Sequence, residues 1–346
     1  MWKVSTGKGI KVAVLDSGVD GSVPELRGQV LPGRDFTEAK SGAPQDREGH
    51  GTDIALLIAG RGTGGGVWGL ARGAKILPLK VLSPKALGTR AMNRAIRSAA
   101  DSGAQVINIS AGRAADELGR AGLQPAVDYA NRKGSLIFAS TGNDGDSTNE
   151  VIYPAALPGV VGIGGVDEKL SVAKTSTHGP QVALTAPGTE IPGLCLEGGG
   201  YCALEGTSGA TAIASASAAL IWSAHPDWTN NQVLRVMIQT AVRPADGKVP
   251  SEFLGYGVVN PGKVLLDKAG KPGPADVNPL HAAPASKPPS PSTPTKKKPS
   301  SPASAQQAVA EPENRVSGTT LWVGIGLGVL AVSAGAAYFL ARRRSA

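Results

Sequence analysis

Three short segments with three different reactive side chains constrain this chain more than any other feature of its sequence. Asp16 ends an apolar run, His50 stands between two glycines, and Ser208 follows Gly-Thr. Residues 11–15 are apolar and rich in β-branched side chains, which favours a buried parallel strand with Asp16 at its carboxyl end. Open α/β sheets bind ligands at that edge. The segments therefore predict an α/β fold with a site where strands give way to helices.

The two later segments predict helices that begin near reactive side chains. Residues 54–59 are apolar, and we expect a helix there with Thr52 as its N-cap, which puts His50 at the helix start. Residues 210–224 have mostly small side chains and predict a buried helix with Ser208 at its amino end. The dipole at that end favours negative charge, so it suits a developing oxyanion.

Together these side chains predict nucleophilic catalysis. Asp16 would hold the His50 imidazole in one tautomer, His50 would act as the general base, and Ser208 would attack. Asn143 follows the apolar strand expected at residues 135–139, and its amide is the candidate donor to the oxyanion. Each residue alone has an ordinary alternative as a cap, turn or core residue. Their joint order favours the catalytic interpretation, with a complete but silent site as the alternative.

The three segments resemble the subtilase family of serine peptidases, in which acid, base and nucleophile follow in the order Asp, His, Ser. The resemblance covers residues 8–265 and, within the family, is strongest to the mycosins, which are membrane-anchored subtilases of type VII secretion systems. It implies a subtilisin-like three-layer α/β fold with a mostly parallel central sheet. It also implies that the backbone of Ser110, Ala111 and Gly112 lines the substrate-binding cleft.

The nucleophile segment departs from the family pattern at two positions. Ala212 stands where most subtilases have proline, and we expect altered local packing there with the chemistry retained. Gly209 replaces the bulkier residue that usually follows the serine. Because glycine loosens the turn, the sequence leaves the rotamer of Ser208 less constrained.

The sequence predicts one catalytic domain, residues 1–268, followed by an appendage. Residues 269–318 carry eleven prolines and almost no large apolar side chain, so we expect a disordered linker. Residues 319–341 are the predicted transmembrane helix, because residues 321–340 are uncharged and a helix of that length spans the bilayer core; a buried terminal helix is the alternative. Arginines in residues 342–346 predict a cytoplasmic tail, with the catalytic domain outside the cell membrane.

The positive charge belongs to the C-terminal part of the chain. The formal net charge is +8, and from Lys268 onward ten Lys and Arg oppose three Asp and Glu, a balance of +7. The preceding residues then hold 25 basic against 24 acidic side chains, or +1. Binding of nucleic acid needs a basic patch on a folded face, so we expect no nucleic-acid partner.

Two further groups of side chains bear on disulfides and metals. Cys195 and Cys202 flank a short glycine-rich loop, and an oxidising environment outside the membrane predicts a disulfide between them, with a metal or redox pair as the alternative. Asp144, Asp146 and Glu150 form an acidic cluster, but calcium needs six to eight oxygen ligands. We predict no required cofactor or metal, with a structural calcium ion as a possibility that these residues alone do not assign to a site.

The leading hypothesis is a membrane-anchored serine endopeptidase that acts on protein or peptide substrates outside the membrane, in association with a type VII secretion complex. Two alternatives remain: a largely non-proteolytic component that stabilises a secretion complex, and a wall-anchored scavenging protease without a secretion partner. Export requires a leader, and no charged and apolar signal precedes the strand at residue 11. We expect either a misplaced start at Met1 or a trimmed leader, and favour the former.

Overall fold

The computed structural model describes residues 1–37, 45–82, 88–114, 117–195 and 200–280, all within a compact unit at residues 1–286. The predicted transmembrane helix at 319–341, the tail at 342–346 and most of the predicted linker lie outside the described residues. No helix in the described ranges combines the length and the apolar character needed to cross a membrane.

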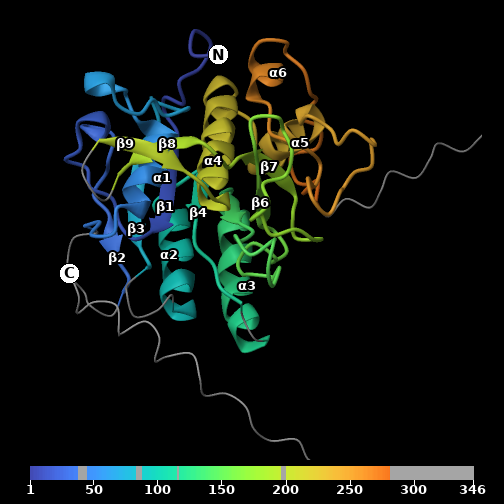
Figure 1. The fold of residues 1–346 in the computed structure, drawn as a ribbon, viewed down its shortest axis with the longest axis horizontal. Helices are drawn as coiled ribbons and strands as arrows, with labels where there is room; N and C mark the ends of the chain where they lie inside the picture. The colour runs from blue at the N-terminus through green and yellow to red at the C-terminus, as the bar shows by residue number, and fades with distance from the viewer. Residues whose placement is uncertain (38–44, 83–87, 115–116, 196–199, 281–346) are drawn as a thin grey trace, which may run out of the picture. The chain divides into compact units, whose positions relative to one another are not determined.

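The described residues form a seven-stranded, fully parallel central sheet (Figure 1). In spatial order its strands are β2 (Arg34–Asp35), β3 (Lys75–Lys80), β1 (Lys11–Asp16), β4 (Val106–Ile109), β5 (Leu136–Ser140), β6 (Val161–Val166) and β7 (Leu184–Pro187). A separate antiparallel hairpin pairs β8 (Ile191–Leu194) with β9 (Tyr201–Leu204). The predicted α/β fold with a mostly parallel sheet is confirmed.

Helices cover both faces of the sheet and make three layers. The helices are α1 (His50–Ala59), α2 (Thr89–Asp101), α3 (Glu117–Arg132), α4 (Thr207–Ala224), α5 (Asn230–Thr240) and α6 (Pro261–Leu265). In Figure 1, α2 and α3 run side by side, while α1 and α4 cover the opposite face of the sheet. Two short 3₁₀ helices also occur: η1 (Pro24–Leu26) lies between β1 and β2, and η2 (Thr63–Gly65) lies between α1 and β3.

Strand β1 shows why its sequence is continuously apolar. Val12 and Val14 pack into the core on the α1 and α4 side, whereas Ala13 and Leu15 pack into the core on the α2 and α3 side. All four side chains are at most 1% exposed. A parallel strand buried on both faces needs apolar residues at every position, and the run ends at the carboxylate of Asp16.

Helix α4 is buried along most of its length and approaches the sheet closely. Ala210, Ala212, Ala214 and Ala218 are fully buried. Small side chains let the helix axis come close to its neighbours without voids. The helix begins at Thr207, earlier than residue 210, so Ser208 is its second residue.

The predicted start of helix α1 was wrong. The helix begins at His50, and its N-cap is Gly49, whose φ of 81° lies in the left-handed region that favours glycine. Thr52 lies inside the first turn, and both its N–H and its hydroxyl donate to Asp46 Oδ2. The prediction failed because other side chains satisfy free N–H groups of the first turn: Asp46 accepts the N–H of Thr52, and Ser17 Oγ accepts the N–H of Gly51.

The folded part continues past the predicted boundary at residue 268. Arg235 on α5 donates to the carbonyl oxygens of Pro272 and Pro274 at 2.6 and 2.7 Å, and to that of Val277. Leu280 packs against the core. Composition suggests a linker here because prolines dominate, but a guanidinium that binds carbonyl oxygens orders such a segment without an apolar core of its own.

Candidate active site

The structure brings Asp16 and His50 together at the carboxyl edge of the sheet. His50 Nδ1 lies 2.7 Å from Asp16 Oδ1, which also accepts the N–H of Ser17 at 2.7 Å. Asp16 is fully buried, while the side chain of His50 is 42% exposed. A carboxylate can only accept, so Nδ1 carries the proton in the neutral ring and Nε2 is left as the base.

Acidic side chains around His50 raise its pKa above the ordinary value. Burial alone, the largest single cause, lowers the pKa of His50. The hydrogen bond and charge of Asp16, with the charges of Asp53 and Asp46, outweigh burial and raise the pKa above 6.5. The environment therefore stabilises the imidazolium that a general base becomes when it accepts a proton.

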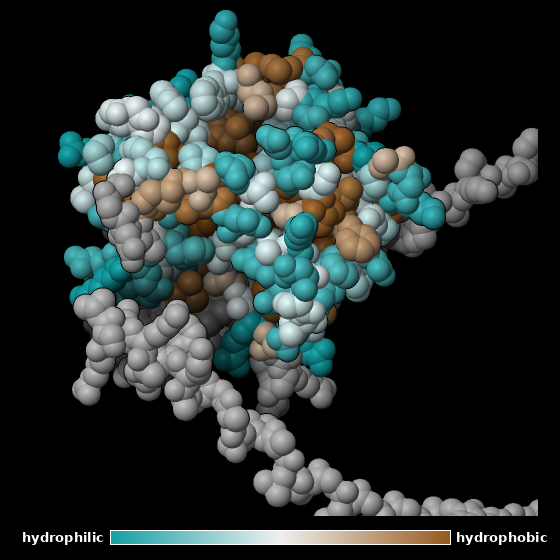
Figure 2. Space-filling view, viewed as in Figure 1, coloured by the Kyte–Doolittle hydropathy of each residue, from teal (hydrophilic) through white to brown (hydrophobic). Residues whose placement is uncertain are grey.

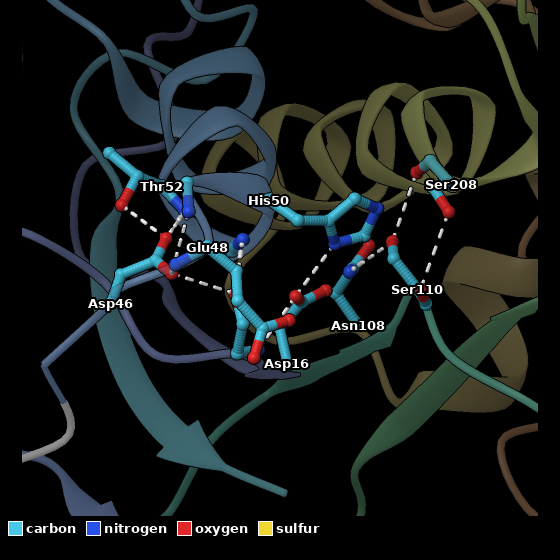
Figure 3. A network of polar contacts seen from close by, with 11 residues as sticks. Asp16, Asp46, Glu48, His50, Thr52, Asn108, Ser110 and Ser208 are labelled. Atoms are coloured by element: carbon cyan, nitrogen blue, oxygen red, sulfur yellow. Dashed lines mark hydrogen bonds and ion pairs between the residues drawn. The ribbon is translucent and has the colours of Figure 1, made fainter. Parts of the chain in front are cut away.

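Asp46 holds the segment that carries His50, and sequence reasoning missed it. Its Oδ1 accepts from Ser17 Oγ and from the N–H groups of Glu48 and Gly49, and its Oδ2 accepts the two bonds from Thr52 (Figure 3). Burial alone would raise the pKa of Asp46, but these hydrogen bonds outweigh burial and lower it. The available signal was an acidic residue four positions before the histidine, directly ahead of a helix start.

Ser208 lies on the other side of the imidazole from Asp16 (Figure 3). Its Oγ donates to the carbonyl oxygen of Ser110 at 3.3 Å, and Ser110 Oγ donates back to the carbonyl oxygen of Ser208 at 3.0 Å. Among the described residues, Ser208 Oγ makes no hydrogen bond to His50 in this rotamer. To reach His50, the hydroxyl must turn away from the carbonyl oxygen of Ser110.

Buried polar side chains tie α4 to β4 beneath the nucleophile. Ser215 Oγ donates to Asn108 Oδ1 at 2.9 Å, and Asn108 Nδ2 donates to Ser110 Oγ at 3.0 Å. Asn108 and Ser215 are both fully buried. Because buried polar groups are costly unless paired, this chain of bonds specifies how the start of α4 docks on the sheet. Asn108, an amide inside an apolar strand, was the sequence signal for this contact.

Asn143 is held with its amide nitrogen free. Its Oδ1 accepts the N–H of Thr207 at 2.9 Å and the Thr207 hydroxyl at 3.0 Å. A backbone N–H only donates, so the oxygen must face Thr207 and Nδ2 must face away. Nδ2 has no partner among the described residues, and Asn143 is exposed. Asn143 follows β5 and lies beside the start of α4, as an oxyanion donor requires.

The three predicted cleft residues follow β4 directly. Ser110 contacts Ser208 as described, Ala111 is buried, and Gly112 is half-buried. A Cβ on Gly112 would lie 2.7 Å from Ile152 Cδ1, so the absence of a side chain lets the two segments approach. Their role in binding substrate through the backbone remains a prediction.

A pocket of about 330 Å³ opens beside His50 and Ser208. Its apolar lining comes from α1 and from the β8–β9 hairpin. Ile191 fills the space next to Gly209, since a Cβ at Gly209 would lie 2.6 Å from Ile191 Cδ1. This packing explains why glycine follows the serine in this chain. In Figure 2, hydrophobic side chains reach the surface in the region where Figure 1 draws the hairpin.

The cysteines carry free thiols in the structure, in contrast to the predicted disulfide. Cys195 follows β8 directly and Cys202 lies in β9, and the hydrogen bond that the Cys195 thiol donates to Cys202 is the main cause that raises the pKa of Cys195 to about 11. The proximity is as expected, and the bond itself stays a prediction.

The three acidic side chains in the loop after Asn143 do not come together in the structure. Within the described ranges, no group of three or more His, Cys, Asp or Glu side chains converges. Asp144, Asp146 and Glu150 are all exposed. No structural calcium site is assigned to them.

Comparison with known proteins shows to which protein family this chain belongs. Residues 7–257 match the subtilase family. Subtilisin E of Bacillus subtilis is 36% identical over 258 residues, which are 74% of this chain and 65% of that protein. This chain belongs to the subtilase family, and it spans slightly less than two thirds of the length of that relative.

Comparison with solved structures shows which subtilases have a similar fold. The structure of MycP1 from Mycobacterium smegmatis superposes with a TM-score of 0.68 and 30% identity, covering 80% of this chain and 84% of that one. MycP3 protease from the type VII (ESX-3) secretion system superposes with a TM-score of 0.66 and 31% identity, covering 76% and 84%. Structural neighbours of this chain therefore include mycosins of type VII secretion systems.

Proposed function

We propose that this protein is a serine endopeptidase with Asp16, His50 and Ser208 as its catalytic triad. The observation that carries the proposal is the 2.7 Å hydrogen bond that orients His50 beside Ser208 at the amino end of a buried helix. Membership of the subtilase family supports the same chemistry. No cofactor or metal is needed for it, because base, nucleophile and oxyanion donors all come from the chain.

The reaction follows from the positions of the side chains. Ser208 turns from the Ser110 carbonyl toward His50 Nε2, loses its proton to that nitrogen and attacks the peptide carbonyl carbon. Asn143 Nδ2 and the N–H of Ser208 donate to the oxygen of the tetrahedral intermediate. Imidazolium then donates its proton to the leaving amine, and water releases the acyl group by the same steps in reverse order.

A fluorophosphonate probe tests the triad directly. Wild-type protein should be labelled on Ser208, and labelling should be lost in Ser208→Ala and strongly slowed in His50→Ala. Peptide masses after digestion of the labelled protein show which residue carries the adduct. Absence of labelling in folded wild-type protein, judged by circular dichroism, would contradict the proposal and favour a non-proteolytic component.

We further propose that the protease is anchored in the cell membrane by residues 319–341, with residues 342–346 in the cytoplasm, and that it acts outside the membrane in a type VII secretion system. Supporting observations are the uncharged stretch followed by three arginines, and the similarity to MycP1 and MycP3 structures. Its partners would be a protein substrate and the secretion complex.

Comparing secreted proteins from a wild-type and a Ser208→Ala strain separates the alternatives. A processing protease leaves one or more secreted proteins unprocessed in the Ser208→Ala strain. A structural component keeps full secretion in that strain but loses it when the gene is deleted. For a wall-anchored scavenging protease, neither Ser208→Ala nor deletion of the gene should change secretion or the processing of secreted proteins. Its gene should lie apart from secretion ATPase genes.

A further inference from the structure

The pocket beside Ser208 has acidic side chains over an apolar lining. Leu57 comes from α1, and Leu194 and Leu204 come from the two strands of the hairpin. Three acidic residues line the same space, namely Glu48, Asp53 and Glu205. None of the described residues that line it is Lys or Arg, and no described Lys or Arg forms an ion pair with these carboxylates.

Asp53 is the carboxylate whose setting is most unusual. It is 6% exposed, and its Oδ1 accepts the N–H of Leu194 at 2.7 Å, which leaves its second oxygen without a partner among the described residues. Burial is the main cause that raises the pKa of Asp53. A largely buried carboxylate that has no Lys or Arg partner among the described residues is costly, and binding of a cationic side chain would relieve this cost.

Glu205 is exposed and lines the same pocket, just before the segment that carries Ser208. Its Oε1 accepts a hydrogen bond from the Thr175 hydroxyl at 3.1 Å, which orients the carboxylate. The two carboxylates therefore reach the pocket from separate elements, one from α1 and one from the loop after β9.

The position of the pocket decides which part of a substrate it meets. In the proposed reaction, the imidazolium of His50 donates its proton to the leaving amine, so the chain after the scissile bond passes the His50 side of Ser208. The pocket is lined by His50 and by Ser208, whereas Asn143 and Ser110 do not line it. It therefore faces the leaving segment.

We infer that this pocket binds the side chain of the residue after the scissile bond and that Asp53 and Glu205 select Lys or Arg there; the inference rests on the proposed peptidase function. The apolar stem of such a side chain covers the leucines of the pocket, and its charged end reaches the carboxylates. Acidic side chains are rejected by like charge.

Capture of the acyl-enzyme by added amines tests this inference. A peptide ester acylates Ser208, and the amine nitrogen of an amino-acid amide then attacks the acyl carbon. A C–N bond forms, the C–Oγ bond breaks, and the amine proton passes through His50 to Ser208 Oγ. The ratio of aminolysis to hydrolysis reports binding of the incoming side chain in the pocket.

Lysine amide and arginine amide should capture the acyl group about fivefold better than norleucine amide, which matches the lysine stem without its charge, and glutamate amide should capture it worst. The lysine advantage should shrink in Asp53→Asn, which keeps the acceptor for Leu194, and in Glu205→Gln. It should also shrink in 1 M salt. Asp227→Asn, an exposed change after α4, is the matched control and should keep the wild-type ratio.

Equal capture of the lysine, norleucine and glutamate amides by wild-type acyl-enzyme would overturn the inference alone. So would a lysine advantage that both pocket variants retain. If no acyl-enzyme forms and the fluorophosphonate probe fails to label Ser208, the proposed function falls, and this inference falls with it.

Discussion

Asp46 Oδ2 accepts two hydrogen bonds from Thr52, one from its backbone N–H at 2.9 Å and one from its hydroxyl at 2.6 Å. With the three bonds to Oδ1, this carboxylate joins the turn after β1 to the first turn of α1. It thereby sets the position of His50 relative to Asp16, although it makes no hydrogen bond to the side chain of either residue.

Asp46→Asn should lower stability and shift the pH dependence of the rate. The amide keeps one acceptor oxygen and turns an NH₂ group toward N–H or O–H donors, which should destabilise the fold by about 1–3 kcal/mol. Its lost charge also lowers the pKa of His50, since Asp46 is one of the charges that raise it. The acidic limb of the pH–rate profile should therefore move to lower pH.

Urea unfolding and pH–rate profiles measure these two effects. Asp167→Asn is the matched control, because Asp167 accepts two backbone N–H groups in an exposed turn away from the site. An unshifted pH–rate profile in Asp46→Asn would contradict the effect of the Asp46 charge on the pKa of His50.

Because the pKa of Asp46 is lowered from 3.8, its contribution to stability is present at neutral pH and is lost as pH falls below that value.

Wild-type activity should depend on a group with a pKa above 6.5. His50 must be neutral to act as a base, and its pKa is raised, so kcat/KM should increase with pH through that raised value. Asp16→Asn removes the main charge that supports the imidazolium and permits the wrong tautomer, so kcat should fall on the order of 10⁴-fold. A wild-type profile with its acidic limb well below 6.5 would contradict the assignment of His50.

Local sequence patterns predicted the parts of the site that belong to single elements. The apolar run before Asp16 specified a strand buried on both faces, and the small residues after Ser208 specified a buried helix, because each pattern reflects its own element. The role of Asp46 could not be predicted in this way. It depends on residues 17 and 46–52 meeting in space, which no periodicity encodes. The acidic pocket likewise needs a hairpin far along the chain to fold over α1.

Asn143 variants should separate oxyanion stabilisation from structural support. Asn143→Asp keeps acceptor oxygens for Thr207 but loses the N–H donor, whereas Asn143→Ala loses both. Each should lower kcat by about 10²–10³-fold with little change in KM. Only the alanine variant should also lose stability through Thr207, by about 1 kcal/mol for each lost hydrogen bond. Near-wild-type kcat in the aspartate variant would remove Asn143 from the mechanism.

Gly51→Ala should disrupt the contact between Asp16 and His50. An added Cβ would lie 2.0 Å from the Gly18 carbonyl oxygen and 3.1 Å from Asp16 Cβ. The nearest atom is backbone, so relief requires moving the β1 turn or α1, at a cost of about 3 kcal/mol or more. In the control Gly122→Ala, within α3, the nearest atom is the Thr89 methyl at 3.1 Å.

Thermal unfolding and hydrolysis of a peptide ester measure the two glycine variants. The control should keep activity and stability, because alanine favours the helix. Gly51→Ala should lower both the melting temperature and kcat. Wild-type activity in Gly51→Ala would show that Asp16 and His50 tolerate a wider separation than the structure indicates.

Cys195 and Cys202 should form a disulfide when the protein is kept under oxidising conditions. Cys195 N–H bonds to the Gly200 carbonyl at 3.0 Å, and the hairpin register brings the second thiol close. The raised pKa of Cys195, about 11, makes its thiolate scarce near neutral pH, so oxidation should speed up as pH rises. Closing the loop should stabilise the hairpin that walls the acidic pocket.

Peptide mass mapping with and without a reductant identifies the cross-link. The oxidised form should resist proteolysis between the two cysteines better than the reduced form. Cys195→Ser with Cys202→Ser is the control that should respond to neither reductant nor oxidant. Detection of two alkylatable thiols after prolonged exposure to oxidised glutathione would show that the hairpin holds the sulfur atoms apart, and that the bond predicted from their spacing does not form.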